Sequence, residues 1–105
     1  MEKLWKKAER KICALFGGKR RGPTGQDDCD CIHPWLAIEI KCRAMPQYLR
    51  EWMGQALANA QPDQLAIVVW HQPGEEYDDD LVILRSKDFR DWFGDGLGGE
   101  HETAQ

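Results

Sequence analysis

Long apolar runs are absent from this sequence of 105 residues. No stretch approaches the roughly 18 apolar residues of a membrane span, so we expect no membrane association. No N-terminal stretch combines a basic segment, a long apolar run and a cleavage site, so we expect no secretory signal. The four Cys invite a disulfide or zinc interpretation, but without an export signal these thiols should stay reduced in the cytoplasm.

Positive charge is scarce after the first 21 residues. Residues 1–21 carry eight Lys or Arg against two Glu, a charge of +6, whereas the rest carries six Lys or Arg against sixteen Asp or Glu, a charge of -10. The net charge of -4 therefore hides one basic end. Binding to phosphates depends on local basic contacts, so this end is a candidate nucleic-acid surface, with a solvated basic helix as the plain alternative.

The hydrophobic pattern predicts one domain over residues 1–94 in which helices alternate with strands. Helices are expected at 2–16, from Pro46 to about Ala60, and at 88–93; strands are expected at 28–32, 35–42, 65–70 and 81–84. A tight turn at His33-Pro34 should join the first two strands, and 65–70 reads as a buried strand. This order predicts an α/β sandwich with a mixed sheet. The Gly-rich polar residues 95–105 are expected to form a disordered tail.

Two charged side chains should share one face of the strand at 35–42. Side chains alternate along a strand, so Glu39 and Lys41 project from one face, while the opposite face carries Leu36, Ile38, Ile40 and Cys42. If the hairpin pairs about its turn, Asp30 approaches Glu39. Two carboxylates, with the Ile40 carbonyl, could then bind Mg²⁺, and Lys41 could orient water or stabilise negative charge. The alternative for an isolated Glu-x-Lys is a surface salt bridge.

The flanking helices add polar candidates. Glu9 lies at the edge of the apolar stripe of the first helix, where it either serves a metal or pairs with Lys6 or Arg10. In the second helix Gln55 shares a face with Tyr48, Trp52 and Asn59, and packing is the favoured reading for Trp52; the core-facing side carries Leu49, Met53, Leu57 and Ala60.

The order of a helical Glu9, Asp30, the run Glu39-Ile40-Lys41 and a helical Gln55 resembles the PD-(D/E)XK nuclease superfamily. It is more closely similar to the short phage and archaeal-type Holliday junction resolvases, and the run from Asp30 to Lys41 matches phage-encoded members especially. So does the run Asp79-Asp80-Leu81-Val82-Ile83-Leu84. The resemblance covers roughly residues 5–93. Two departures are that Cys29 precedes Asp30 where the family has Pro, and that Asp28 is an alternative ligand.

The resemblance implies a restriction-endonuclease-like core, with a central mixed β-sheet flanked by helices, and an Mg²⁺-dependent endonuclease for which Mn²⁺ should substitute. It implies a homodimer acting on branched double-stranded DNA, in the host-cell cytoplasm if the protein is phage-encoded. Catalytic roles fall to Glu9, Asp30, Glu39, Lys41 and Gln55, and metal binding to Asp30, Glu39, Ile40 and Glu9. DNA contacts are expected from Lys6, Arg10, Lys19, Arg20, Arg21, Thr24 and Arg43.

Other functions compete with junction resolution. One alternative is a nicking, flap or repair endonuclease with the same fold but without specificity for junctions. Another is a relative that binds DNA through the basic residues but has no catalytic activity. A zinc module could use Cys29, Cys31, His33 and Cys42, although this spacing is not usual for structural zinc.

Overall fold

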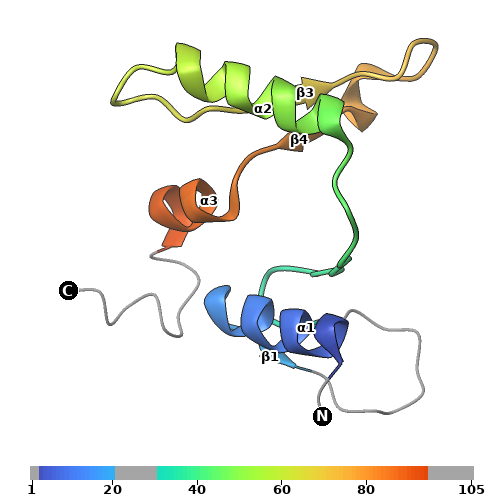
Figure 1. Cartoon of the computed structure of the whole chain (residues 1–105), viewed down its shortest axis with the longest axis vertical. Helices are drawn as coiled ribbons and strands as arrows, with labels where there is room; N and C mark the ends of the chain where they lie inside the picture. The colour runs from blue at the N-terminus through green and yellow to red at the C-terminus, as the bar shows by residue number, and fades with distance from the viewer. Residues whose placement is uncertain (1–2, 21–30, 95–105) are drawn as a thin grey trace. The chain divides into compact units, whose positions relative to one another are not determined.

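A computed structural model describes residues 3–20 and 31–94 of the chain. Its elements, shown in Figure 1, are α1 (Leu4–Leu15), β1 (Lys19–Arg20), β2 (Cys31–Ile32), α2 (Gln47–Asn59), β3 (Val68–Trp70), the 3₁₀ turn η1 (Tyr77–Asp79), β4 (Leu81–Ile83) and α3 (Ser86–Phe93). The chain divides into two compact units, Met1–Arg43 with Phe93–Gln105, and Ala44–Trp92. The expected tail at 95–105 lies outside the described residues, and the single-domain organisation stays a prediction.

The first helix ends where its glycines predict. Gly17 adopts a φ of 76°, a left-handed conformation that favours glycine. Its N–H donates to the Ala14 carbonyl and the Gly18 N–H donates to the Cys13 carbonyl, which together form a Schellman cap. This cap reverses the chain directly after α1 and leads it into β1.

A disulfide forms the centre of the first unit. Cys13 of α1 and Cys31 of β2 are bonded, with Cα atoms 5.7 Å apart, and retain only 1% and 2% of their exposure. β1 pairs antiparallel with β2, placing Lys19 opposite Ile32 and Arg20 opposite Cys31. The expectation that all four thiols are reduced is therefore wrong for this pair, because the chain reversal after α1 brings β2 against the helix.

The second unit packs α2 against the antiparallel pair β3–β4. Pro46 precedes the helix and its carbonyl accepts the N–H groups of Leu49 and Arg50. The rings of Tyr48 and Trp52 lie 5.9 and 5.1 Å from that of Trp70, both edge-on. Such edge-to-face contacts add to the burial of the rings, so the packing role expected for Trp52 is confirmed.

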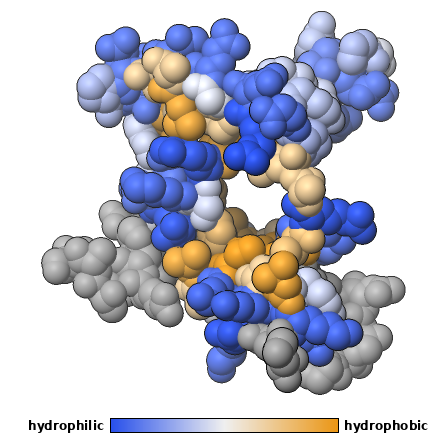
Figure 2. All heavy atoms as spheres, viewed as in Figure 1, coloured by the Kyte–Doolittle hydropathy of each residue, from blue (hydrophilic) through white to orange (hydrophobic). Residues whose placement is uncertain are grey.

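The β3–β4 hairpin is less buried than its apolar sequence suggests. Val69 pairs with Val82, and both are more than half exposed, whereas Val68 and Trp70 are half-buried. The prediction of a buried strand at 65–70 is thus wrong for alternate residues, since a two-stranded sheet covered by one helix leaves its other face open. Figure 2 likewise shows apolar residues at the surface among hydrophilic ones.

The last helix, α3, carries ion pairs along its exposed side. Arg85 lies just before α3 and contacts Asp88 with its Nε 2.9 Å from the Asp88 Oδ2, and Lys87 pairs with Asp91 at 2.8 Å. The hydrogen bond from Arg85 holds the pKa of the Asp88 carboxyl below its usual value, and the same bond raises the pKa of Arg85.

The strands within the described residues form two separate two-stranded antiparallel sheets instead of one mixed sheet. β1 and β2 belong to one unit and β3 and β4 to the other, so each strand is paired with a near neighbour in sequence. The mixture of helices and strands agrees with the expected α/β class. The restriction-endonuclease-like core stays a prediction.

Candidate functional site

The segment that carries Glu39 and Lys41 is extended but is not a regular strand. Of the expected strand at 35–42, only Ile38 makes a β-bridge, to Cys31, and of the strand at 28–32 only Cys31–Ile32 is described as such. β2 pairs with β1, and its Cys31 is bonded to Cys13. The single bridge from Cys31 to Ile38 is not enough to form the expected hairpin between the two predicted strands. The His33-Pro34 turn is present, and the His33 Nδ1 accepts the N–H groups of Trp35 and Leu36 at 3.3 and 3.2 Å.

The predicted alternation of side chains holds from Leu36 to Lys41. Ile40 is buried, while its neighbours Glu39 and Lys41 are 61% and 71% exposed. The Lys41 Nζ lies 3.1 Å from the Glu39 Oε2, so a carboxylate and an ammonium stand side by side on the solvent face. Burial of Ile40 fixes the backbone between them. Cys42 is exposed, contrary to its expected place on the buried face, because the alternation ends at Lys41.

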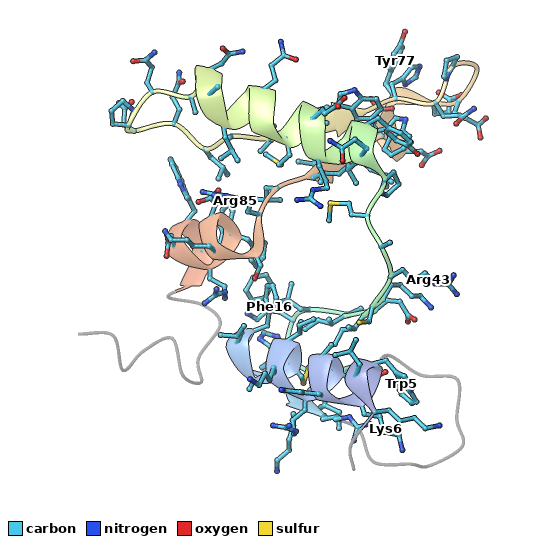
Figure 3. The ribbon with its side chains drawn as sticks, viewed as in Figure 1. Trp5, Lys6, Phe16, Arg43, Tyr77 and Arg85 are labelled. Carbon is cyan, nitrogen blue, oxygen red and sulfur yellow. A yellow bond between two sulfur atoms is a disulfide. The ribbon has the colours of Figure 1, made fainter. Side chains whose placement is uncertain are left out.

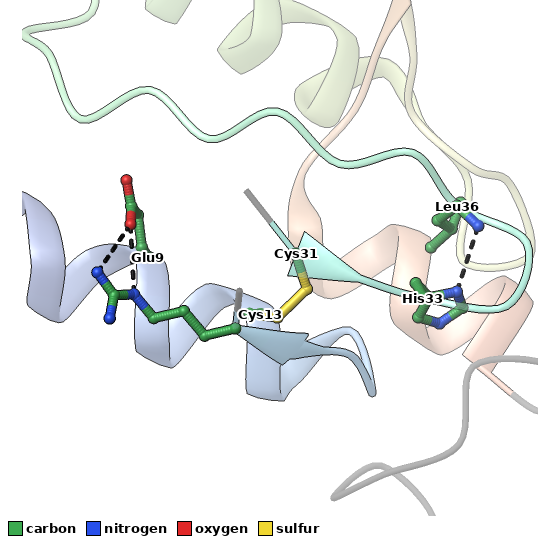
Figure 4. The surroundings of a disulfide bond; sticks show 6 residues. Glu9, Cys13, Cys31, His33 and Leu36 are labelled. Carbon is green, nitrogen blue, oxygen red and sulfur yellow. Dashed lines mark hydrogen bonds and ion pairs between the residues drawn. A yellow bond between two sulfur atoms is a disulfide. The ribbon is translucent and has the colours of Figure 1, made fainter. Parts of the chain in front are cut away.

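Glu9 is held by an arginine from the other side of the chain reversal. The Nε and Nη2 of Arg20 both lie 3.3 Å from the Glu9 Oε1, across 11 residues of sequence (Figure 4). Arg20 was not among the partners considered from the sequence, which were Lys6 and Arg10. The helix geometry offered near neighbours in sequence, whereas β1 brings Arg20 alongside α1. A predicted catalytic carboxylate and a predicted DNA-binding residue are thus in direct contact.

The disulfide limits the zinc alternative. The Cys31 sulfur is bonded to Cys13, so in this state it has no thiolate to offer a metal. Cys29 lies outside the described residues, as do the candidates Asp30, Arg21 and Thr24.

The basic candidates gather on α1 and on the segments near it. Lys6, Arg10, Lys19 and Arg20 are exposed, and the Lys6 Nζ lies 5.5 Å from the ring centroid of Trp5. Figure 3 shows Lys6 beside Trp5 near the start of α1, and Arg43 on the segment that follows Lys41. These cations all belong to the first unit, and exposed cations on one unit could contact several phosphates.

Gln55 lies on α2 in the second unit and is exposed. On the opposite side of α2, Leu49, Met53 and Leu57 are half-buried, as the sequence predicts. The catalytic role expected for Gln55 stays a prediction, because Gln55 belongs to the second unit and the other described catalytic candidates belong to the first.

The sequence reasoning missed a cluster beside the β3–β4 hairpin. The His71 Nδ1 lies 2.7 Å from the Asp80 Oδ1, and the His71 ring stacks on Tyr77 at 4.5 Å. The pairing of Trp70 with Leu81 places His71 opposite Asp80 one step further along the same register, and this register is not visible in the sequence. A neighbouring pocket of about 370 Å³ is lined by Trp70, Gln72, Glu75, Glu76, Asp79, Asp80 and Leu81.

The described residues do not by themselves assemble a metal centre. Within 3–20 and 31–94, no group of three or more His, Cys, Asp or Glu side chains could hold a metal ion. Glu9 and Glu39, the described carboxylates of the expected ligand set, are each paired with a cation. No described helix is long and apolar enough to cross a membrane. No family model, curated protein or solved structure matches the chain.

Proposed function

We propose that this protein is an Mg²⁺-dependent endonuclease of the PD-(D/E)XK type that cuts four-way DNA junctions. The observation that carries the proposal is the exposed Glu39–Lys41 pair, which flanks the buried Ile40. Phosphodiester hydrolysis can use both charges: the carboxylate to hold a metal or act on the attacking water, and the cation to stabilise charge on the phosphate.

The second support is the position of the basic residues. DNA carries one negative charge per roughly 1.7 Å of duplex, so a surface that binds it needs several cations close together. Residues 1–21 provide a charge of +6, and their described cations lie on α1, on β1 and at Lys3 directly before α1, in the unit that also contains Glu39 and Lys41. The acidic character of the remaining chain does not oppose binding at this surface.

In the proposed site Asp30 and Glu39, with Glu9 and the Ile40 carbonyl, would hold Mg²⁺, and Mn²⁺ would replace it. The ion would offset negative charge at the scissile phosphate. Lys41 lies beside Glu39, so it could contact the phosphate that the metal ion contacts. Gln55 is proposed to assist these catalytic residues. Paired symmetric cuts in a junction require two sites, so the proposal includes a two-fold homodimer.

The test is cleavage of a synthetic four-way junction, a flap and a linear duplex with Mg²⁺ or Mn²⁺. We expect paired incisions in the junction, and a loss of at least about 100-fold in rate for Lys41→Ala. Lys87→Ala is the matched control, because Lys87 forms an equally exposed ion pair with Asp91 on α3. Both variants should retain the wild-type circular dichroism.

Other outcomes of the same assay are informative. Equal cutting of the linear duplex would replace junction resolution with a nicking or repair activity. Equal losses in Lys41→Ala and Lys87→Ala would remove Lys41 from the site. Sedimentation analysis gives the oligomeric state, and a strict monomer on the junction would contradict paired cutting by a dimer.

A further inference from the structure

The Glu9–Arg20 pair is one of two neighbouring ties between α1 and the β1–β2 ribbon. Glu9 and Cys13 are four residues apart and so lie on the same side of α1. Arg20 is opposite Cys31 in the β1–β2 register, and Cys31 is bonded to Cys13. The ion pair and the disulfide therefore form two adjacent links between the same elements (Figure 4).

Of these two links, the ion pair is the exchangeable one. Both donors of Arg20 lie 3.3 Å from a single oxygen of Glu9, longer than the roughly 2.7–2.9 Å of a strong charge-assisted hydrogen bond. The Arg20 and Glu9 side chains keep 33% and 18% of their exposure, so solvent reaches the pair. The buried disulfide holds α1 and β2 together whether or not the ion pair is made.

A phosphate would suit the Arg20 guanidinium better than this single oxygen does. A guanidinium presents parallel N–H donors that match two oxygens of a phosphate. Glu9 is also the sole acidic residue in the sequence from 3 to 20, which otherwise contains seven Lys or Arg. A DNA phosphate drawn to these cations would compete with Glu9 for Arg20.

We propose that Arg20 is a positioning residue that exchanges partners: it holds Glu9 in the free protein and transfers to a DNA phosphate in the complex. The exchange releases the Glu9 carboxylate when substrate is bound and not before. This inference rests on the proposed function, since it states how DNA binding would release Glu9, a residue of the proposed metal site.

The experiment is binding of the full-length protein to a fluorescent four-way junction in EDTA, at a series of salt concentrations. Arg20→Gln should weaken binding and reduce the slope of log K against log salt by about 0.9, the loss of one phosphate contact. Glu9→Gln should tighten binding by about two- to fivefold, because the DNA no longer competes with the carboxylate. In the Arg20→Gln background, Glu9→Gln should give no such gain.

Glu51→Gln is the matched control, since it removes one negative charge from exposed α2, where Glu51 accepts a hydrogen bond from Gln47. If Glu51→Gln tightens junction binding as much as Glu9→Gln does, the exchange is overturned, because the gain in affinity would then come from the change in net charge alone. An unchanged salt slope in Arg20→Gln would also overturn it.

The wild-type protein supplies a measurement that does not depend on the folding of any variant. The Arg20 Nε–H signal in an NMR spectrum should shift when the junction is added in EDTA, and an unmoved signal would refute the exchange. If the protein binds the junction with these effects but does not cut it in Mg²⁺, the proposed nuclease activity is contradicted and the Arg20 exchange is supported. If it cuts the junction without these effects, the exchange is contradicted and the nuclease activity is supported. A protein that does not bind the junction contradicts both proposals.

Discussion

Removing the disulfide by the double substitution Cys13→Ala, Cys31→Ala should lower the free energy of unfolding by about 3 kcal/mol. The bond joins residues 18 apart in sequence. For a loop of that length the chain-entropy model gives a loss of roughly 11 cal/mol/K in the unfolded chain, which is about 3 kcal/mol at roughly 25 °C. Domains of this size are stable by only about 5–15 kcal/mol, so the effect is a large fraction of the total.

The assay is equilibrium unfolding in urea, followed by the fluorescence of the five Trp residues. The midpoint should fall, and the denaturant slope should rise because the unlinked chain exposes more surface when unfolded. Wild type treated with a dithiol reductant should approach the double variant. Cys42→Ser is the control, since Cys42 is exposed and unbonded, and its change should stay within about 0.5 kcal/mol.

Two results would refute this reasoning. The first is a double variant within about 1 kcal/mol of wild type, because the loop-closure entropy would then be missing. The second is peptide mass spectrometry under non-reducing conditions that finds Cys13 and Cys31 unlinked.

Three further predictions concern the two units separately. Gly18→Ala should lower the thermal midpoint by an amount equivalent to about 1–3 kcal/mol. The reason is that the new Cβ would overlap the Cys31 sulfur and lie 2.8 Å from the carbonyl oxygen of Ile32. A midpoint equal to that of wild type would contradict this close approach. Trp70→Ala should cost about 2 kcal/mol in urea, less than a fully buried Trp, through loss of its two edge-on ring contacts, and a neutral result would deny the cluster a packing role. Arg85→Gln should raise the pKa of Asp88 toward its ordinary value in an NMR titration. Because that pKa is lowered in the folded protein, the pair stabilises the fold fully above the unfolded pKa of about 3.9. Wild type should lose this stabilisation as pH falls below that value and through the lowered pKa of the folded carboxyl, while the variant should not.

Several local features could be predicted from the sequence because short-range rules decide them. The glycines after residue 16 end α1, since only glycine readily takes the left-handed turn there. The alternation from Leu36 to Lys41 follows from extended backbone, and it put Glu39 and Lys41 on one face with Ile40 buried between them. Both apolar strands of the β3–β4 hairpin were predicted, whereas their pairing as a separate two-stranded sheet and its open face were not.

The contacts that join distant residues were decided by the tertiary structure alone. Four cysteines permit several pairings, and the reversal after α1 selected Cys13 with Cys31. The same reversal gave Glu9 its partner Arg20, 11 residues away, where helical spacing had offered only near neighbours. The sequence by itself determined which residue types are available and which local faces they share. Which of these residues come into contact depends on how the chain folds back on itself. That folding depends on the burial and pairing of residues far apart in the sequence, and a local sequence pattern does not contain this information.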